Sequence, residues 1–141
     1  MSKDWCKDIY DMHKHFGFHE AVEKLDQDKL NQYLKFRIDF LQEELNELKN
    51  AEFGEDVVDA LIDLCVVAIG TLDLYDVDAH KAWDEVHKAN MSKRAGIKPN
   101  RPNKLKLPDL MKPEGWQAPS HENNHGLTKN IDYKWLVSQY N

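Results

Sequence analysis

The chain has 141 residues, a length that predicts one compact domain. With 41% hydrophobic and 31% charged residues, its composition excludes a disordered polyelectrolyte. The formal net charge of -6 disfavours a general nucleic-acid binder, which needs a basic face to neutralise phosphates, so we expect no nucleic-acid partner.

No membrane-spanning or secreted class is indicated. Residues 57–74 form the longest nearly apolar run, and three aspartates interrupt it, which makes it a poor membrane span. The first residues lack the hydrophobic stretch of a signal peptide. Two cysteines, Cys6 and Cys65, form no Cys-x-x-Cys pair and no disulfide framework. We therefore expect a cytoplasmic protein that contacts no membrane.

Apolar residues recur at helical spacing through the first two-thirds of the chain. Ser2 is a candidate N-cap for a first helix that stops near Gly17. Further helices are predicted over about 28–50, over 55–74, and from Asp76 or Asp78 to about Arg94. The helix predicted over 55–74, the third in the chain, is almost wholly apolar and is expected at the centre of a bundle. The predicted fold class is all-α, with four to five helices.

The composition changes after Gly96. All five prolines lie in the following stretch, mixed with asparagine, lysine and histidine, which is typical of extended chain or loops. No strand-like alternation is long enough to predict a sheet. We predict a helical domain over 1–96 and an irregular extension over 97–141, whose aromatic residues pack on the bundle or on a neighbouring subunit.

An acidic stripe runs along the apolar third helix. Asp56, Asp59 and Asp63 follow one another at i, i+3 and i+7 and so point in one direction. Burying unpaired carboxylates is costly, so a positive group is expected to face them. A network with lysines of another helix is an alternative to a metal ion.

The second helix supplies more acid. Glu44 projects into its apolar stripe, with Glu43 and Glu47 beside it, and Arg37 projects into the same stripe two turns earlier. If the two helices pack antiparallel, Glu44 and Glu47 can face Asp59 and Asp56. Converging carboxylates suit Mg²⁺ or Mn²⁺. The alternative for the glutamates is a solvated surface stripe.

Glu44-x-x-Glu47, followed by an acidic x-x-Asp element on the next helix, resembles the metal signature of the MazG-like all-α nucleoside triphosphate pyrophosphohydrolases. That superfamily also contains dimeric dUTPases and phosphoribosyl-ATP pyrophosphohydrolases. Three stretches carry the resemblance, residues 40–48, 59–71 and 83–93, and residues 112–116 look like tails of phage-encoded members.

The second motif departs from the usual Glu-x-x-Asp of the family. Asp56-x-x-Asp59 keeps an acid at both positions and is the preferred register. A register four residues later uses Asp63 and leaves Ala60 at the glutamate position.

The resemblance implies hydrolysis of a (d)NTP to the monophosphate and pyrophosphate with two or more Mg²⁺ or Mn²⁺ ions. The ligand set it implies is Glu43, Glu44, Glu47, Asp56 and Asp59. Glu43 or Glu44 is the candidate catalytic carboxylate that orients or deprotonates the attacking water.

Substrate-binding candidates lie on the fourth predicted helix, namely Trp83, Asn90, Lys93 and Arg94. Asn90 is equally explained as a helix C-cap, and the basic residues as complements of the helix dipole. His13 and His19 are candidates for hydrogen bonds to a base, although surface histidines are commoner.

The resulting hypothesis is a phage-type homodimer or homotetramer in the host cytoplasm that acts on a purine nucleotide such as dGTP. A pyrimidine substrate, dUTP or dCTP, is the first alternative. A non-catalytic helical interaction module is the second, in which the acidic stripe binds a basic partner surface.

Overall fold

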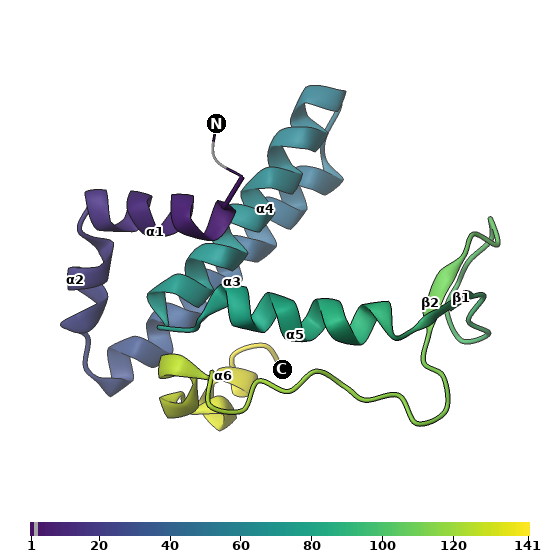
Figure 1. Cartoon of the computed structure of the whole chain (residues 1–141). Coiled ribbons are helices and arrows are strands. Elements are labelled where there is room, and N and C mark those ends of the chain that lie inside the picture. Colours follow the sequence, from purple (N-terminus) through teal and green to yellow (C-terminus); the bar gives the residue numbers. More distant parts are fainter. Residues whose placement is uncertain (2) are drawn as a thin grey trace. The chain divides into compact units, whose positions relative to one another are not determined.

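The computed structural model describes Met1 and residues 3–141 and confirms the all-α prediction (Figure 1). Its elements in chain order are α1 (Trp5–His15), α2 (Phe18–Glu23), α3 (Gln27–Lys49), α4 (Gly54–Leu74), α5 (Ala79–Met91), β1 (Arg94–Gly96), β2 (Asp109–Met111), the 3₁₀ helix η1 (Gly126–Asn130) and α6 (Tyr133–Ser138).

The chain forms two compact units. The first comprises residues 1–79 together with 125–141, and the second comprises residues 80–124. The domain division between residues 96 and 97 stays a prediction.

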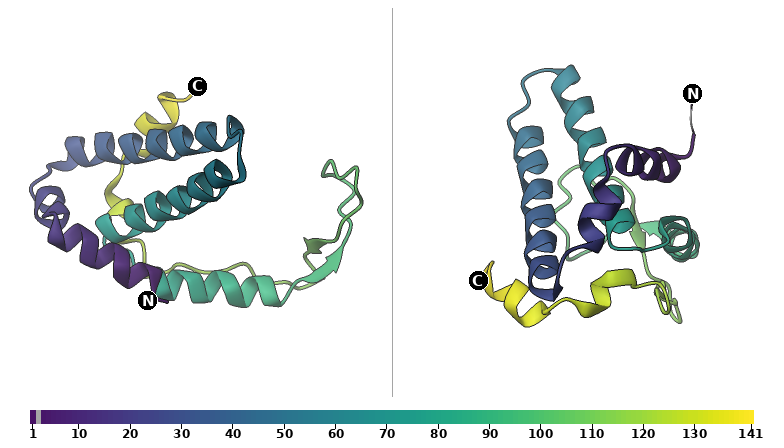
Figure 2. Two further views of the ribbon diagram at one scale, coloured as in Figure 1. Left: turned by 90° about the horizontal axis from the view of Figure 1, so that it is seen from above. Right: turned by 90° about the vertical axis from the view of Figure 1, so that its left-hand side faces the viewer.

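The two long helices of the first unit begin and end within two residues of their predicted bounds. The Asp26 side chain caps α3 by accepting a hydrogen bond from the Lys29 amide at 2.9 Å. Residues 50–53 connect α3 to α4, and the two helices run antiparallel side by side (Figure 2). The α3–α4 pair is therefore the scaffold on which the predicted acidic residues are displayed.

The first helix is capped by Asp4, whose side chain accepts a hydrogen bond from the Lys7 amide at 3.0 Å. The predicted cap, Ser2, lies outside the described residues. Gly17 has a positive φ of 74° and separates α1 from α2, as a helix-stop glycine does.

The core of the first unit lies at the C-terminal end of α4. Tyr75 is fully buried, and its hydroxyl donates to the Leu30 carbonyl at 2.7 Å. Ile131 and Leu136 of the C-terminal segment join this cluster. At Gly126 the C-terminal segment passes close to the end of α4, because a Cβ there would lie 2.0 Å from the Tyr75 carbonyl oxygen. Residues 125–141 thus complete the core of the helical unit.

Several short elements differ from the prediction. The helices α2 and α6 have six residues each and were not predicted, since so short a segment shows less than two periods of apolar spacing. The fourth predicted helix ends at Met91, and Arg94 begins a strand instead. The unpredicted two-stranded antiparallel sheet pairs Arg94 with Met111. Strands of three residues show too little alternation of polar and apolar side chains to be predicted from the sequence.

Among the residues that the structure describes, no helix combines the length and apolar character needed to span a membrane.

Three polar side chains join α1, α2 and α4. Asp73 Oδ2 lies 2.6 Å from His13 Nδ1 and 2.7 Å from His19 Nε2. His13 is almost fully buried, and a Cβ at Gly70 would lie 3.1 Å from its Cε1 atom. The absence of a side chain at residue 70 therefore lets the His13 ring pack directly on α4.

We predict that Asp73→Ala lowers the free energy of unfolding by about 2 kcal/mol, because it leaves a buried imidazole without its partner. Urea unfolding at pH 7.5 measures the loss. The matched control is Asp11→Ala, which removes only the exposed Lys7–Asp11 pair and should cost less than about 0.5 kcal/mol. Equal losses in the two variants would show that the histidine contacts do not stabilise the fold.

Candidate metal centre

Three carboxylates converge between α3 and α4. Glu44 and Glu47 lie one turn apart on α3, and Asp63 faces them from α4; each offers an oxygen atom within 4.8 Å of the other two. The antiparallel helix pair produces this convergence, because it brings the last turns of α3 beside the first half of α4.

Glu44 is the member of the trio whose environment is least favourable for a free carboxylate. The residue is 8% exposed, and its Oε2 atom is buried without a hydrogen-bond partner. Desolvation by burial raises the pKa of Glu44, and the neighbouring charges of Glu47 and Asp63 raise this pKa further. A positively charged group in the cluster would relieve both effects.

Among the residues that the structure describes, no lysine or arginine supplies that charge. Within Met1 and residues 3–141, none of the three carboxylates forms an ion pair with a lysine or arginine. The buried Arg37 guanidinium donates instead to Thr71 Oγ1 and to the Val67 carbonyl oxygen, each at 3.0 Å. The lysine network was the alternative for Asp56, Asp59 and Asp63, and in the described part of the chain none of these aspartates forms an ion pair with a lysine.

The donor set fits a hard divalent cation. Mg²⁺ and Mn²⁺ prefer carboxylate oxygens, and Glu44, whose buried Oε2 has no hydrogen-bond partner, belongs to a cluster of three carboxylates. This combination of a buried acceptor and two flanking acids distinguishes the trio from an ordinary solvated acidic face.

The other predicted ligands lie in the solvent. Glu43, Asp56 and Asp59 are exposed, and their role as ligands stays a prediction. The structure brings Asp63 to Glu44 and Glu47, which corresponds to the later of the two registers considered for the second motif. The signal for Asp63 in the sequence was its place on the same helical stripe as Asp59.

Residues of the predicted substrate-binding group lie in the second unit. Trp83 is 71% exposed, Asn90 is half-buried near the end of α5, and Arg94 is the first residue of β1. The Lys93 ammonium lies 5.1 Å from the centroid of the Trp116 ring. The sequence does not predict this contact of Lys93 with Trp116, because the contact depends on the pairing of β1 with β2, which was not predicted.

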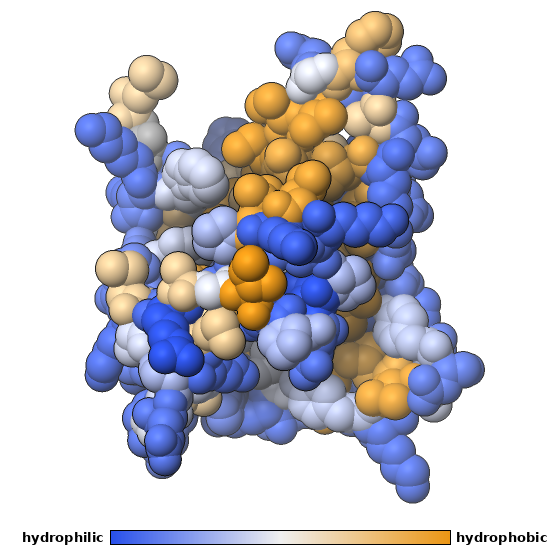
Figure 3. Space-filling view, turned by 90° about the vertical axis from the view of Figure 1, so that its right-hand side faces the viewer, coloured by the Kyte–Doolittle hydropathy of each residue, from blue (hydrophilic) through white to orange (hydrophobic). Residues whose placement is uncertain are grey.

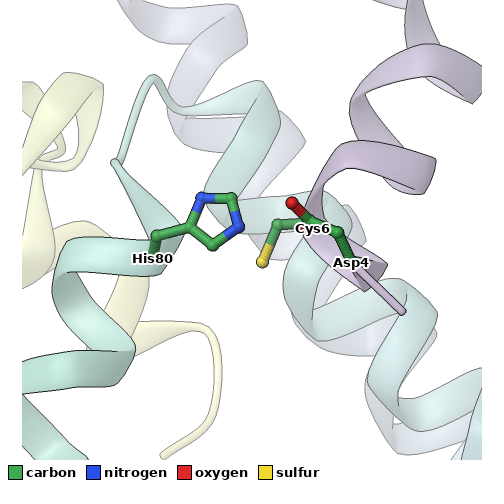
Figure 4. A group of neighbouring side chains, drawn as sticks. All are labelled: Asp4, Cys6 and His80. Atoms are coloured by element: carbon green, nitrogen blue, oxygen red, sulfur yellow. The ribbon is translucent and has the colours of Figure 1, made fainter. Parts of the chain in front are cut away.

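Cys6 lies in the first turn of α1, close to the N-cap residue Asp4 (Figure 4). Burial raises the pKa of the Cys6 thiol, and the charges of Asp4, Asp78 and Asp73 raise it further. The reactive thiolate is thereby disfavoured, so Cys6 is a poor nucleophile. His80, drawn in the same view, begins the second unit.

The fold and the carboxylate trio define an all-α protein whose central helix pair is suited to bind a divalent cation. The family model for phosphoribosyl-ATP pyrophosphohydrolase matches residues 10–90, more than half of the chain. The protein belongs to this family, within the MazG-like nucleoside triphosphate pyrophosphohydrolase superfamily. No curated protein matches the chain.

We predict that Glu44→Gln stabilises the metal-free protein, and that its advantage grows with pH. Below the ordinary glutamate pKa of 4.5 both proteins are neutral at this position. As pH rises from 4.5 through the raised pKa, the wild type must bury a charge and loses stability, whereas glutamine does not.

Urea unfolding in EDTA at pH 4, 6 and 8 measures this difference, which we expect to reach about 1 kcal/mol. Glu43→Gln, at the exposed neighbouring position, is the control and should show little change. A stability difference that is the same at all three pH values would contradict the burial argument.

Proposed function

We propose that the protein is a metal-dependent nucleoside triphosphate pyrophosphohydrolase that converts a (d)NTP and water to the (d)NMP and pyrophosphate. The observation that carries this proposal is the buried, unpartnered Glu44 carboxylate flanked by Glu47 and Asp63. Membership of a pyrophosphohydrolase family supports the same reaction class. A non-catalytic module has no need to bury an acid at this cost.

Glu44, Glu47 and Asp63 would hold Mg²⁺ or Mn²⁺, with Glu43, Asp56 and Asp59 as further candidate ligands on the same two helices. When bound, such ions lower the pKa of coordinated water and neutralise phosphate oxygens. Glu43 is exposed beside the trio, where it can orient the attacking water and accept its proton.

The products follow from the bond that breaks. Water adds to the α-phosphorus, the bond from that phosphorus to the α–β bridging oxygen breaks, and pyrophosphate leaves with the bridging oxygen. In the proposed scheme Asn90, Lys93 and Arg94 bind the phosphates or sugar, and the exposed Trp83 ring stacks on the base. A purine such as dGTP is proposed as substrate because a large base gains most from stacking.

We predict that Glu44→Gln, Glu47→Gln and Asp63→Asn each reduce turnover at least about 100-fold, since each removes ligand charge without removing volume. Pyrophosphate release from all eight common (d)NTPs and from phosphoribosyl-ATP, with Mn²⁺ or Mg²⁺, measures turnover and identifies the base. Preference for dUTP or dCTP would establish the pyrimidine alternative.

The paired variants Asp59→Asn and Asp63→Asn test the register of the second motif. A greater loss in Asp63→Asn supports the structural trio as the main ligand set, whereas a greater loss in Asp59→Asn supports the register preferred from the sequence. Asp39→Asn, on the exposed side of α3 and paired with Lys35, is the control. No pyrophosphate release from any nucleotide, and no thermal stabilisation by Mn²⁺, would leave the interaction module as the function.

We also propose that the protein is a homodimer or homotetramer. Val57, Val58, Leu61 and Ile62 form an exposed apolar stripe on α4. Figure 3 shows hydrophobic side chains, in orange, gathered toward the end of the molecule that carries the α3–α4 connection. A second copy of the same stripe would cover this surface by isologous packing.

Leu61→Asp is expected to convert the oligomer to a monomer of 16.5 kDa in light scattering, because it places a charge in the apolar contact. Val137→Asp, at an exposed apolar position of α6, is the control and should leave the mass unchanged. A wild-type mass of 16.5 kDa would rule out the proposed assembly.

A further inference from the structure

Two histidines and an aspartate of the helical unit meet at one oxygen atom. Asp73 Oδ2 of α4 lies 2.6 Å from His13 Nδ1 and 2.7 Å from His19 Nε2. These three atoms are of the kinds that bind metal ions, and all lie within 4.8 Å of one another. The three residues belong to the same compact unit, so their arrangement is set within that unit.

The backbone between the histidines directs both rings to the same point. His13 lies in the last turn of α1, and His19 is the second residue of α2. In a continuous helix, residues six positions apart would point about 120° away from each other. Gly17, with its positive φ of 74°, turns the chain between the two helices and removes this divergence.

Aromatic neighbours hold the two imidazoles in place. The Phe18 ring centroid lies 5.3 Å from that of His13, and the Tyr10 ring centroid lies 4.8 Å from that of His19. The two imidazole rings are perpendicular to each other. Packing of this kind keeps ligand side chains oriented before a ligand arrives.

The charge of Asp73 has no permanently charged partner. In the described part of the chain, its carboxylate forms ion pairs with His13 and His19 only, and a histidine carries a charge only when protonated. The nearby Arg37 guanidinium donates instead to Thr71 Oγ1 and to the Val67 carbonyl oxygen. A cation held between the three side chains would compensate this charge.

We propose that His13 Nδ1, His19 Nε2 and Asp73 Oδ2 form a second metal site, suited to a transition-metal ion such as Zn²⁺. Imidazole nitrogens favour Zn²⁺ over Mg²⁺, which distinguishes this site from the oxygen-only trio of Glu44, Glu47 and Asp63. Each neutral ring would carry its proton on the nitrogen that faces away from the ion. Three protein ligands leave the fourth position of tetrahedral zinc to water.

The site requires a small adjustment to admit the ion. Ligand atoms around tetrahedral zinc lie about 3.4 Å apart, because each bond is about 2.0–2.1 Å long. The two distances to Asp73 Oδ2 must therefore increase by about 0.7 Å. The His13 side chain is 3% exposed, whereas those of His19 and Asp73 are 23% and 16% exposed. The latter two can move and give the ion a path from solvent.

A metal ion at this site would fasten α1 and α2 to the C-terminal part of α4. Arg37 also approaches this part of the helix, since a Cβ at Gly70 would lie 2.8 Å from its Nη2 atom and 3.1 Å from His13 Cε1. Its positive charge opposes any nearby cation. We therefore expect a dissociation constant on the order of 1 µM for Zn²⁺, weaker than that of four-ligand structural sites.

The experiment titrates the full-length protein with ZnCl₂ in excess Mg²⁺, which competes for the carboxylate trio, and follows binding by calorimetry. We expect one Zn²⁺ per chain. His19→Gln should weaken binding at least about tenfold, since it removes a ligand. His15→Gln, at an exposed histidine of α1, is the matched control and should change the affinity less than twofold.

NMR of the wild type identifies the ligand atoms without any substitution. Zn²⁺ should shift the ¹⁵N resonances of His13 Nδ1 and His19 Nε2 and leave those of His15 in place. This measurement decides the question even where His19→Gln does not fold.

Three results would overturn the proposal. Unmoved resonances of His13 and His19 at saturating Zn²⁺ would mean a hydrogen-bonded trio only. Equal losses of affinity in His19→Gln and His15→Gln would place the ion elsewhere. Shifts of both rings on addition of a nucleotide, but not of Zn²⁺, would assign the histidines to the base.

This inference and the proposed function can fail separately, because the two sites share no residue. Glu44→Gln should abolish hydrolysis and keep the Zn²⁺-dependent shifts of His13 and His19. Loss of those shifts in Glu44→Gln would overturn the second site, whereas their persistence without hydrolysis of any nucleotide by the wild type would reject the enzymatic proposal alone.

Discussion

The main physical constraint on the helical unit is a carboxylate that is buried beside two others. Glu44 lies between α3 and α4 with one oxygen unpartnered, and Glu47 and Asp63 add negative charge to the same place. In the described part of the chain, neither the Arg37 guanidinium nor any lysine forms an ion pair with the cluster. A free acid in this position opposes folding, so the arrangement makes physical sense as a cation site.

Other contacts of the helical unit hold the C-terminal part of α4 against its neighbouring helices. At one end the buried Tyr75 hydroxyl bonds to the Leu30 carbonyl, and the C-terminal segment closes the core. At the same end of α4, Asp73 binds His13 of α1 and His19 of α2, while Gly70 leaves room for the His13 imidazole. These contacts hold the acidic residues at fixed positions without using any of the three carboxylates.

The two units divide the charge of the chain unequally. The helical unit has ten lysine and arginine residues against twenty aspartate and glutamate residues, whereas residues 80–124 have a formal charge of +4. The carboxylate trio belongs to the first of these units, and the contacts of Lys93 and Lys112 with Trp116 belong to the second.

Helical periodicity alone determined the all-α class, the two long helices and the placement of Glu44 inside an apolar stripe, because these follow from side-chain spacing along one helix. Tertiary structure decided which aspartate meets Glu44. Asp56, Asp59 and Asp63 share one stripe, and only the axial register of α4 against α3 selects Asp63. The Lys93–Trp116–Lys112 contact likewise required strand pairing, since residues far apart in sequence carry no periodic signal of their contact.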